Sequence, residues 1–237
     1  MLSSNAIKEK IDDLYFVFQP IIQAVSSLEQ DVCSYEVLLR SKENSSFPFE
    51  LFMTLIADED SNELLLEQYT EMVYDYMERI PNADLSLNLH PQQLTYESTW
   101  EFLKSIQMYS DRITIEFTEF PPEDYTRRVF STRQWMNQIN EMGFTIALDD
   151  VDCGLNSMQF VMEHIDVLSS IKFSILPFRK MNRSTLLHFL KGWIEIARHH
   201  QVKLVVEAVE DAELAAKLHE MGVIFQQGYF WGRGRRL

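Results

Sequence analysis

The stretch Glu141-Met142-Gly143-Phe144-Thr145-Ile146-Ala147-Leu148-Asp149-Asp150 decides the fold of this chain. Its first three residues are typical of the end of a helix, because glycine readily adopts the left-handed conformation that follows one. A short apolar run comes next, and two aspartates stand where that strand would end. The same order of helix end and strand recurs at residues 220–227, which indicates that helices and strands alternate along the chain.

Strands and helices are expected in turn over nearly the whole chain. The expected strands are Leu14–Ile22, Cys33–Leu39, Leu85–Leu89, Ile113–Phe117, Thr145–Leu148, Ile171–Phe173, Leu204–Val206 and Ile224–Gln227. The expected helices are Phe49–Ala57, Asn62–Arg79, Tyr96–Met108, Thr126–Met142, Ser157–Ile165, Ser184–His199 and Asp211–Met221. In a chain of 237 residues, this pattern predicts an α/β fold of the (β/α)8 TIM-barrel-like type.

Two further features refine this prediction. Only the short polar segment Gln23–Asp31 joins the first two strands, which predicts a hairpin and therefore an antiparallel first strand. No low-complexity linker and no shift of composition divides the chain, so we expect one domain over residues 1–237.

Acidic residues outnumber basic ones, since 36 Asp and Glu against 21 Lys and Arg give a formal net charge of −15. This balance disfavours direct binding to nucleic acid or to an anionic membrane surface, because both need clustered cations. Residues 1–13 lack the apolar core of a signal peptide, and no apolar run reaches the ~20 residues of a membrane span. The two cysteines, Cys33 and Cys153, cannot form a disulfide framework, so we expect a soluble cytoplasmic protein.

Polar side chains stand within or directly after the expected strands, most of them where the strand ends. They are Glu36, Asn88, Glu116, Asp149, Asp150, Lys172, Glu207 and Gln227. In a barrel of parallel strands these ends share one face, so side chains that are distant in sequence would meet there. Carboxylate and amide oxygens suit Mg²⁺ or Mn²⁺ rather than Zn²⁺. Strand ends are often polar merely because they reach solvent, but this explanation is weaker for the whole set than for any one residue.

The set has the composition of a metal-dependent phosphodiesterase site, or of the remains of one. Adjacent Asp149 and Asp150 could contact two ions about 3.5–4 Å apart, a spacing that clamps the attacking and leaving oxygens of a phosphodiester. Lys172 and Glu207 would orient and deprotonate the attacking water. Arg40 could bind a phosphate through two nitrogens of its guanidinium group.

At these residues the chain resembles the EAL domain, a bacterial barrel that hydrolyses cyclic di-GMP with two divalent metal ions. Tyr35-Glu36-Val37-Leu38-Leu39-Arg40 is similar to the motif that names the family, with Val37 in place of its alanine. The further matches are Leu87-Asn88-Leu89-His90-Pro91-Gln92-Gln93-Leu94, Ile115-Glu116-Phe117-Thr118-Glu119, Asp149-Asp150, Lys172, Glu207 and Gln227. The resemblance implies metal contacts at Glu36, Asn88, Glu116, Asp149 and Asp150, catalytic roles for Lys172 and Glu207, and ligand contacts at Arg40 and Gln227.

The departures from the family pattern surround this set. The family follows its aspartate pair with Phe-Gly-small-Gly, whereas this chain has Val151-Asp152-Cys153-Gly154, in which a charged side chain replaces a glycine. Ser174 stands in place of an aspartate of the family, and Ser41 in place of a frequent tryptophan. Because metal-binding geometry depends on such surrounding residues, we expect a degenerate site whose metal, ligand and catalytic positions are vestigial.

The resemblance also suggests a role. Among EAL domains, the chain is similar to a stand-alone, non-catalytic type of enteric bacteria that binds FlhD, a subunit of the flagellar master activator FlhDC. We therefore expect a regulator that needs no cofactor, binds FlhD, inhibits DNA binding by the activator and represses flagellar genes and motility. An acidic chain suits a partner with a basic face. The alternatives are an active phosphodiesterase that uses Mg²⁺ or Mn²⁺, and a receptor that binds cyclic di-GMP without cleaving it.

Overall fold

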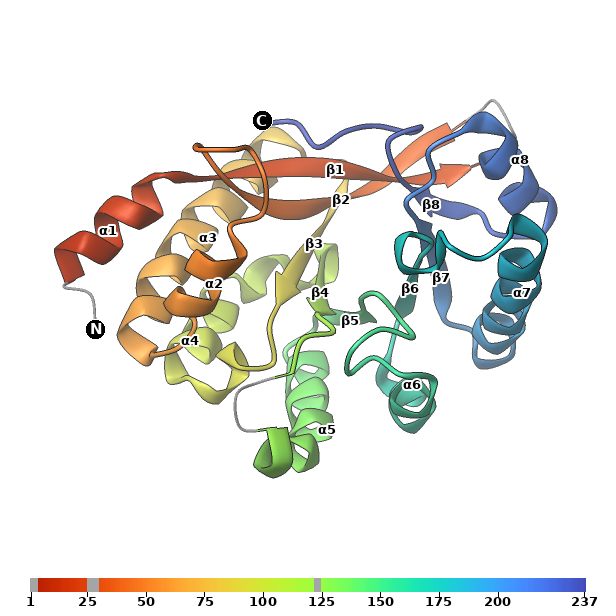
Figure 1. Ribbon diagram of the computed structural model, residues 1–237. Helices are drawn as coiled ribbons and strands as arrows, with labels where there is room; N and C mark the ends of the chain where they lie inside the picture. Colours follow the sequence, from red (N-terminus) through yellow and green to blue (C-terminus); the bar gives the residue numbers. More distant parts are fainter. Residues whose placement is uncertain (1–3, 25–29, 122–124) are drawn as a thin grey trace.

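The strands of the chain form a closed barrel that carries helices on its outside (Figure 1). The computed structural model describes residues 4–24, 30–121 and 125–237. Around the barrel the strands follow one another in the order of the sequence, from β1 to β8. Neighbouring strands from β2 to β8 are parallel, whereas β1 is antiparallel to both β2 and β8. The prediction of an α/β barrel with an antiparallel first strand is confirmed.

The bounds of the elements lie close to those expected from the sequence. The strands are β1 (Leu14–Ala24), β2 (Gln30–Ser41), β3 (Asp84–Leu89), β4 (Ile113–Phe117), β5 (Thr145–Leu148), β6 (Ser170–Ser174), β7 (Lys203–Glu207) and β8 (Phe225–Gln227). The α-helices are α1 (Ser4–Asp12), α2 (Phe49–Leu55), α3 (Glu59–Arg79), α4 (Glu97–Ser105), α5 (Tyr125–Glu141), α6 (Met158–His164), α7 (Arg183–His200) and α8 (Ala212–Glu220). Short 3₁₀ turns lie at Gln93–Thr95, Gln107–Arg112, Ile165–Val167 and Leu176–Phe178.

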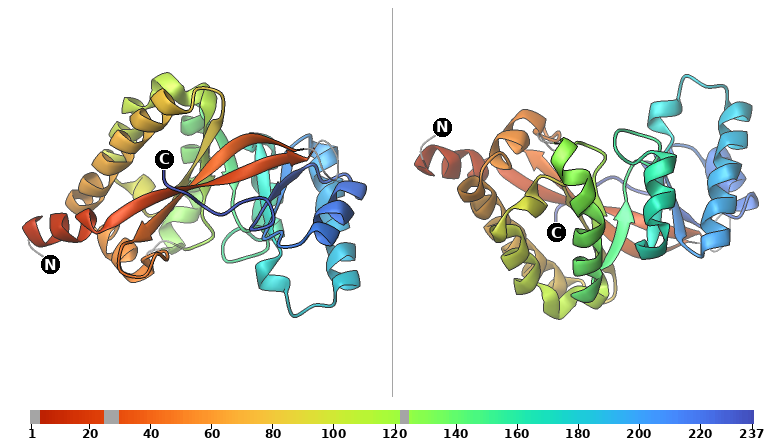
Figure 2. Two further views of the ribbon diagram at one scale, coloured as in Figure 1. Left: turned by 90° about the horizontal axis from the view of Figure 1, so that it is seen from above. Right: turned by 90° about the horizontal axis from the view of Figure 1, so that it is seen from below.

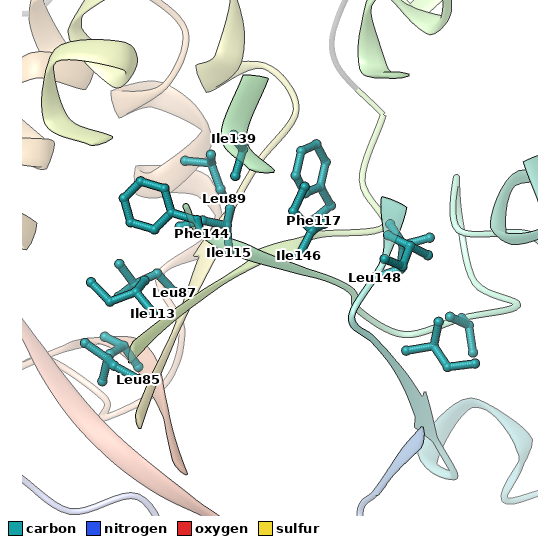
Figure 3. Close-up of a cluster of buried hydrophobic side chains, with 14 of the residues drawn as sticks. Leu85, Leu87, Leu89, Ile113, Ile115, Phe117, Ile139, Phe144, Ile146 and Leu148 are labelled. Carbon is teal, nitrogen blue, oxygen red and sulfur yellow. The ribbon is translucent and has the colours of Figure 1, made fainter. Parts of the chain in front are cut away.

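The strands present an apolar face to the helices and a polar face to the barrel interior. Figure 3 shows the apolar side chains of β3 to β5 with those of Phe144 and of Ile139 on α5, namely Leu85, Leu87, Leu89, Ile113, Ile115, Phe117, Ile139, Phe144, Ile146 and Leu148. Residues between them, such as Asn88 and Glu116, point to the other face, because successive side chains of a strand alternate. The hydrophobic core therefore lies between the barrel and its helices, and the interior is left for polar groups.

β1 closes the barrel. It pairs with β2 from Leu14, opposite Ser41, to Ala24, but it pairs with β8 only over residues 21–23. The end of the chain runs back along the remaining edge of β1 (Figure 2). There, Phe18 and Arg235 exchange backbone hydrogen bonds of 2.8 and 3.1 Å. This pairing satisfies backbone groups that an edge strand would otherwise expose.

Two details differ from the expected elements, and one expected segment is described only in part. The helix α1 was not expected, because its sequence is polar, but it places Ile11 in the core. The helix expected over Tyr96–Met108 ends at Ser105, and a 3₁₀ turn continues to Arg112. Part of the segment that joins β1 to β2, residues 25–29, lies outside the described residues. Among the described helices, none is both long enough and apolar enough to cross a membrane.

Candidate functional site

The ammonium group of Lys172 lies among four carboxylates at the carboxyl ends of the strands. Its Nζ atom is 2.7 Å from Glu116 Oε2 on β4 and 3.1 Å from Glu36 Oε2 on β2. It is also 3.0 Å from Asp149 Oδ1, which follows β5, and 3.0 Å from Glu207 Oε1 on β7. The side chains of Lys172 and Glu116 are each only 1% exposed. One buried cation therefore faces four carboxylates, which leaves three formal negative charges without compensation.

Two amide side chains orient the carboxylate of Glu36. Asn88 Nδ2, on β3, donates a hydrogen bond of 2.8 Å to Glu36 Oε1. Gln227 Nε2, on β8, donates one of 2.6 Å to Glu36 Oε2. The structure thus brings polar residues of β2, β3, β4, β6, β7 and β8, together with Asp149, into one cluster, and the sequence predicted this convergence.

Burial and crowding shift the pKa values of these carboxylates. Burial raises the pKa of Glu116 to about 8, against the opposing charge of Lys172. Burial likewise raises the pKa of Asp149 to about 6 and that of Glu207 well above its usual range. Burial also acts on Glu36, but Lys172 and the two amide donors outweigh it and lower the pKa of this carboxyl. The cluster holds more negative charge than one lysine neutralises, so its carboxyl groups take up protons unless further cations bind.

A second group of carboxylates adjoins the first. Oxygens of Glu36, Glu116 and Asp149 lie within 4.8 Å of one another, and so do oxygens of Glu119, Asp149 and Asp150. Burial raises the pKa of Glu119 to about 7 and also raises that of Asp150. Two adjacent sets of oxygen ligands that share Asp149 fit a pair of Mg²⁺ or Mn²⁺ ions.

The loop after β5 carries two of the departures from the family pattern, Val151 and Asp152, and the fold accommodates them. Val151 is fully buried, and its N–H donates a hydrogen bond of 2.9 Å to the carbonyl oxygen of Lys172. Asp152 accepts a hydrogen bond of 2.7 Å from the indole N–H of Trp193 on α7, which directs its charge to an outer helix. Ser174 lies where the family has an aspartate, and its neutral hydroxyl acts to lower the pKa of Asp150, against the larger effect of burial.

The last two residues of this loop have different constraints. Gly154 has a φ of +46°, and a Cβ atom there would lie 2.2 Å from the carbonyl oxygen of Glu119, so this close approach requires glycine. The N–H of Leu155 donates to that same carbonyl oxygen at 2.8 Å. Burial raises the pKa of the Cys153 thiol to about 11, which keeps the thiol protonated and unreactive near neutral pH.

A cavity of about 220 Å³ opens beside the carboxylates. Its polar walls include Glu36, Arg40, Asn88, Asp149 and Asp150, and its aromatic walls are Phe47, Phe49, Phe52, Tyr69 and Phe120. Two polar atoms of its lining residues, His90 Nε2 and Thr118 Oγ1, are buried without a hydrogen-bond partner in the described part of the chain. A ligand with an aromatic face and polar edges fits these walls, because it would stack on the rings and pair with such atoms.

Sequence reasoning missed several residues of this region. Glu119 has no role in the prediction from sequence, although its place two residues after the end of β4 is a usable signal. The phenylalanines of the cavity lie in the segment Phe47–Phe52 and at Phe120, and their clustering next to strand ends was a weaker signal. The contact of Asp152 with Trp193 had no signal in the sequence, because the two residues belong to different elements.

The chain is similar to known proteins in sequence and in fold. Over 175 residues the chain is 23% identical to the probable cyclic di-GMP phosphodiesterase PdeB of Escherichia coli, covering 72% of this chain and 32% of that protein. The matched part of the chain spans less than a third of the length of each of these curated relatives. The complex of Klebsiella pneumoniae BlrP1 with calcium and cyclic di-GMP has a TM-score of 0.74 at 22% identity, covering 94% of this chain and 56% of that one.

A second solved structure is similar over the length of both chains. The PaMucR phosphodiesterase in complex with cyclic di-GMP has a TM-score of 0.76 at 18% identity, and the match covers 97% of this chain and 96% of that one. Likeness at such low identity shows the fold alone. The EAL domain model, however, matches residues 4–234. The chain therefore belongs to the EAL domain family.

Proposed function

We propose that this chain hydrolyses a phosphodiester bond of cyclic di-GMP with two divalent metal ions. The observation that carries the proposal is the cluster around Lys172, in which four carboxylates surround one ammonium group. An excess of buried negative charge is unfavourable unless cations compensate it. The names of the relatives support the choice of substrate, since PdeB is named a probable cyclic di-GMP phosphodiesterase.

The two groups of carboxylates divide the metal ligands between them. One ion would be held by Glu36, Asn88, Glu116 and Asp149, and the other by Glu119, Asp149 and Asp150. Bound divalent ions polarise phosphoryl oxygens and lower the pKa of a coordinated water. The side chains of Asn88 and Gln227 keep the carboxylate of Glu36 in one orientation, which prepares it for a cation.

Residues at the rim of the cluster would transfer protons and bind phosphate. Glu207 is the candidate general base, because burial raises its pKa and a raised pKa favours proton acceptance near neutral pH. Lys172 holds Glu207 in place through the contact of 3.0 Å between Nζ and Oε1. Arg40 lines the cavity, where its guanidinium group offers the forked donor geometry that suits a phosphate.

The shape of the cavity supports a nucleotide ligand. The ring centroids of Phe49 and Phe120 lie 5.4 Å apart, and those of Phe47 and Phe52 lie 5.3 Å apart. Stacking on such rings suits a purine base. At about 220 Å³ the cavity is smaller than the ~300–1,000 Å³ of pockets that enclose drug-sized ligands, so part of a dinucleotide would extend beyond it.

The test is hydrolysis of cyclic di-GMP by the purified chain with Mn²⁺ or Mg²⁺, with chromatographic detection of the linear dinucleotide. We expect turnover on the order of 1 s⁻¹ or above. Glu116→Gln should lower it by about 100-fold, because it removes a metal ligand. Glu78→Gln, on the exposed side of α3, is the matched control and should leave turnover unchanged. Product formation at background level with both metals would refute the proposal.

The second candidate is the degenerate, non-catalytic regulator that the sequence suggested, which binds FlhD and represses flagellar genes and motility. The altered loop Val151–Gly154 and the net charge of −15 favour it, because an acidic surface complements a basic partner. Binding of cyclic di-GMP without cleavage is the third outcome of the same assay. In each of these proposals the protein acts in the cytoplasm.

Co-purification with FlhD tests the regulator. If the role is independent of hydrolysis, the wild type and Glu36→Ala should bind FlhD equally and repress motility equally. A folded wild-type chain that does not bind FlhD eliminates this candidate.

A further inference from the structure

We propose that Asp152 and Trp193 are positioning residues that anchor the metal-binding loop after β5. The proposal rests on the metal-dependent function proposed above and concerns how this chain supports its own ligands. Asp152 lies in the loop that begins with Asp149 and Asp150, whereas Trp193 belongs to α7, on the outside of the barrel. Their contact ties the loop to a helix 41 residues further along the chain.

The contact is well placed to act as an anchor. The indole N–H of Trp193 donates a hydrogen bond of 2.7 Å to Asp152 Oδ2. Trp193 is fully buried, so its N–H has no access to water and needs an acceptor from the protein. A carboxylate is a stronger acceptor than a neutral group, which favours this pairing over a contact with a backbone carbonyl.

The loop needs an anchor because its backbone is strained. Asp150 has a φ of +44° and Asp152 a φ of +68°, in the left-handed region that side chains disfavour. The turn is tight, since the N–H of Asp152 donates to Asn156 O at 2.8 Å and that of Cys153 to Asp150 O at 3.0 Å. Such a conformation persists only when contacts with the surrounding structure hold it.

The anchor also explains why aspartate is tolerated where the family pattern has glycine. Glycine would adopt the positive φ without strain, but it would leave the indole N–H of Trp193 without its acceptor. Aspartate is among the few residues that visit the left-handed region, and its carboxylate supplies the acceptor. Because Asp149 and Asp150 precede it directly, a fixed loop presents their oxygens to a cation with less loss of conformational freedom.

Manganese affinity of the full chain, measured by calorimetric titration, tests the anchor. We expect Trp193→Phe and Asp152→Gly each to weaken Mn²⁺ binding by about 10-fold, the lower end of the effect of residues that orient metal ligands. Asp152→Asn should stay within about threefold of the wild type, because its amide oxygen still accepts the indole hydrogen bond and asparagine tolerates the same φ. Trp100→Phe is the matched control, since it removes an indole N–H that donates to Leu94 O and makes this contact with no residue of the loop.

Hydrogen exchange supplies a second measurement that does not depend on metal. The amides of residues 149–156 should exchange faster in Trp193→Phe and Asp152→Gly than in Asp152→Asn and the wild type, while exchange in the strands stays unchanged. Equal Mn²⁺ affinity and equal exchange in Asp152→Gly and the wild type would overturn the proposal. Equal losses in Asp152→Asn and Asp152→Gly would also overturn it, because they would make the charge, and not the contact, responsible.

The outcomes for the anchor and for the proposed function are separable. If Trp193→Phe does not fold, the comparison of Asp152→Gly with Asp152→Asn decides the question alone. If the wild type binds Mn²⁺ but does not hydrolyse cyclic di-GMP, the function fails and Mn²⁺ affinity still decides the anchor. If the wild type binds no Mn²⁺, the proposed function fails and hydrogen exchange decides the anchor.

Discussion

Replacing Lys172 by methionine tests the role of the central cation. Lys172→Met keeps an unbranched apolar side chain but removes the charge, so four carboxylates are left facing one another in a buried site. Removing one partner of a buried charge cluster costs about 3–5 kcal/mol of unfolding free energy. In a chain of 237 residues each kcal/mol lowers Tm by about 2–4 °C, so we expect a decrease of about 6–20 °C.

Thermal unfolding in the presence of a chelator, at pH 8 and at pH 5.5, measures this effect. The decrease should be smaller at pH 5.5, because carboxyl groups that have lost their cation take up protons. Added Mn²⁺ should raise the Tm of the variant more than that of the wild type, because the ion replaces the missing charge. Lys104→Met, an exposed site on α4, is the control. A Tm within about 2 °C of the wild type at pH 8 without metal would refute the reasoning.

Three further predictions follow from the same site. Burial raises the pKa of Glu116 to about 8 and that of Asp149 to about 6, so the folded chain keeps protons that the unfolded chain releases near pH 4. The free energy of unfolding of the metal-free protein should therefore decrease as pH rises from about 4 to about 8. Urea unfolding that gives the same free energy across this range would contradict the prediction. The thiol of Cys153, with a pKa of about 11, should react with iodoacetamide at pH 8 about 100-fold more slowly than a thiol of pKa 9, as mass spectrometry over time would show. Gly154→Ala should lower both Tm and Mn²⁺ affinity, because its Cβ would lie 2.2 Å from a backbone carbonyl oxygen. Gly192→Ala on α7 is the control: its Cβ would have no atom within 4 Å, so this variant should raise Tm slightly in the same assays.

The barrel could be predicted from the sequence because its signals are local. The apolar run of β5 follows a clear helix end at Gly143, and both β4 and β5 begin and end at the expected residues. Polar residues at strand ends then predicted the cluster, since parallel neighbours in register bring such ends together. Asn88 and Glu116, for example, lie opposite each other on β3 and β4.

The remaining features depend on packing that no local pattern encodes. The hydrogen bond between Trp193 and Asp152 requires α7 to lie against the loop after β5, and nothing near either residue signals this. Glu119 joins the carboxylates only because the chain turns directly after β4 and meets the loop at Gly154. Such contacts arise from the closed barrel as a whole, so sequence reasoning places the cluster but misses the residues that support it.

The reversed direction of β1 decides where the chain enters the barrel. Leu14 lies opposite Ser41 and Tyr15 opposite Arg40, so β1 starts at the rim where Arg40 borders the cavity. In a barrel of eight parallel strands the chain would enter at the opposite rim. The nine residues of α1, about 14 Å of helix, come between Ser4 and this rim. A tether fused ahead of Ser4 would thus be attached on the side of the barrel that carries the cavity, separated from the start of β1 by one short helix.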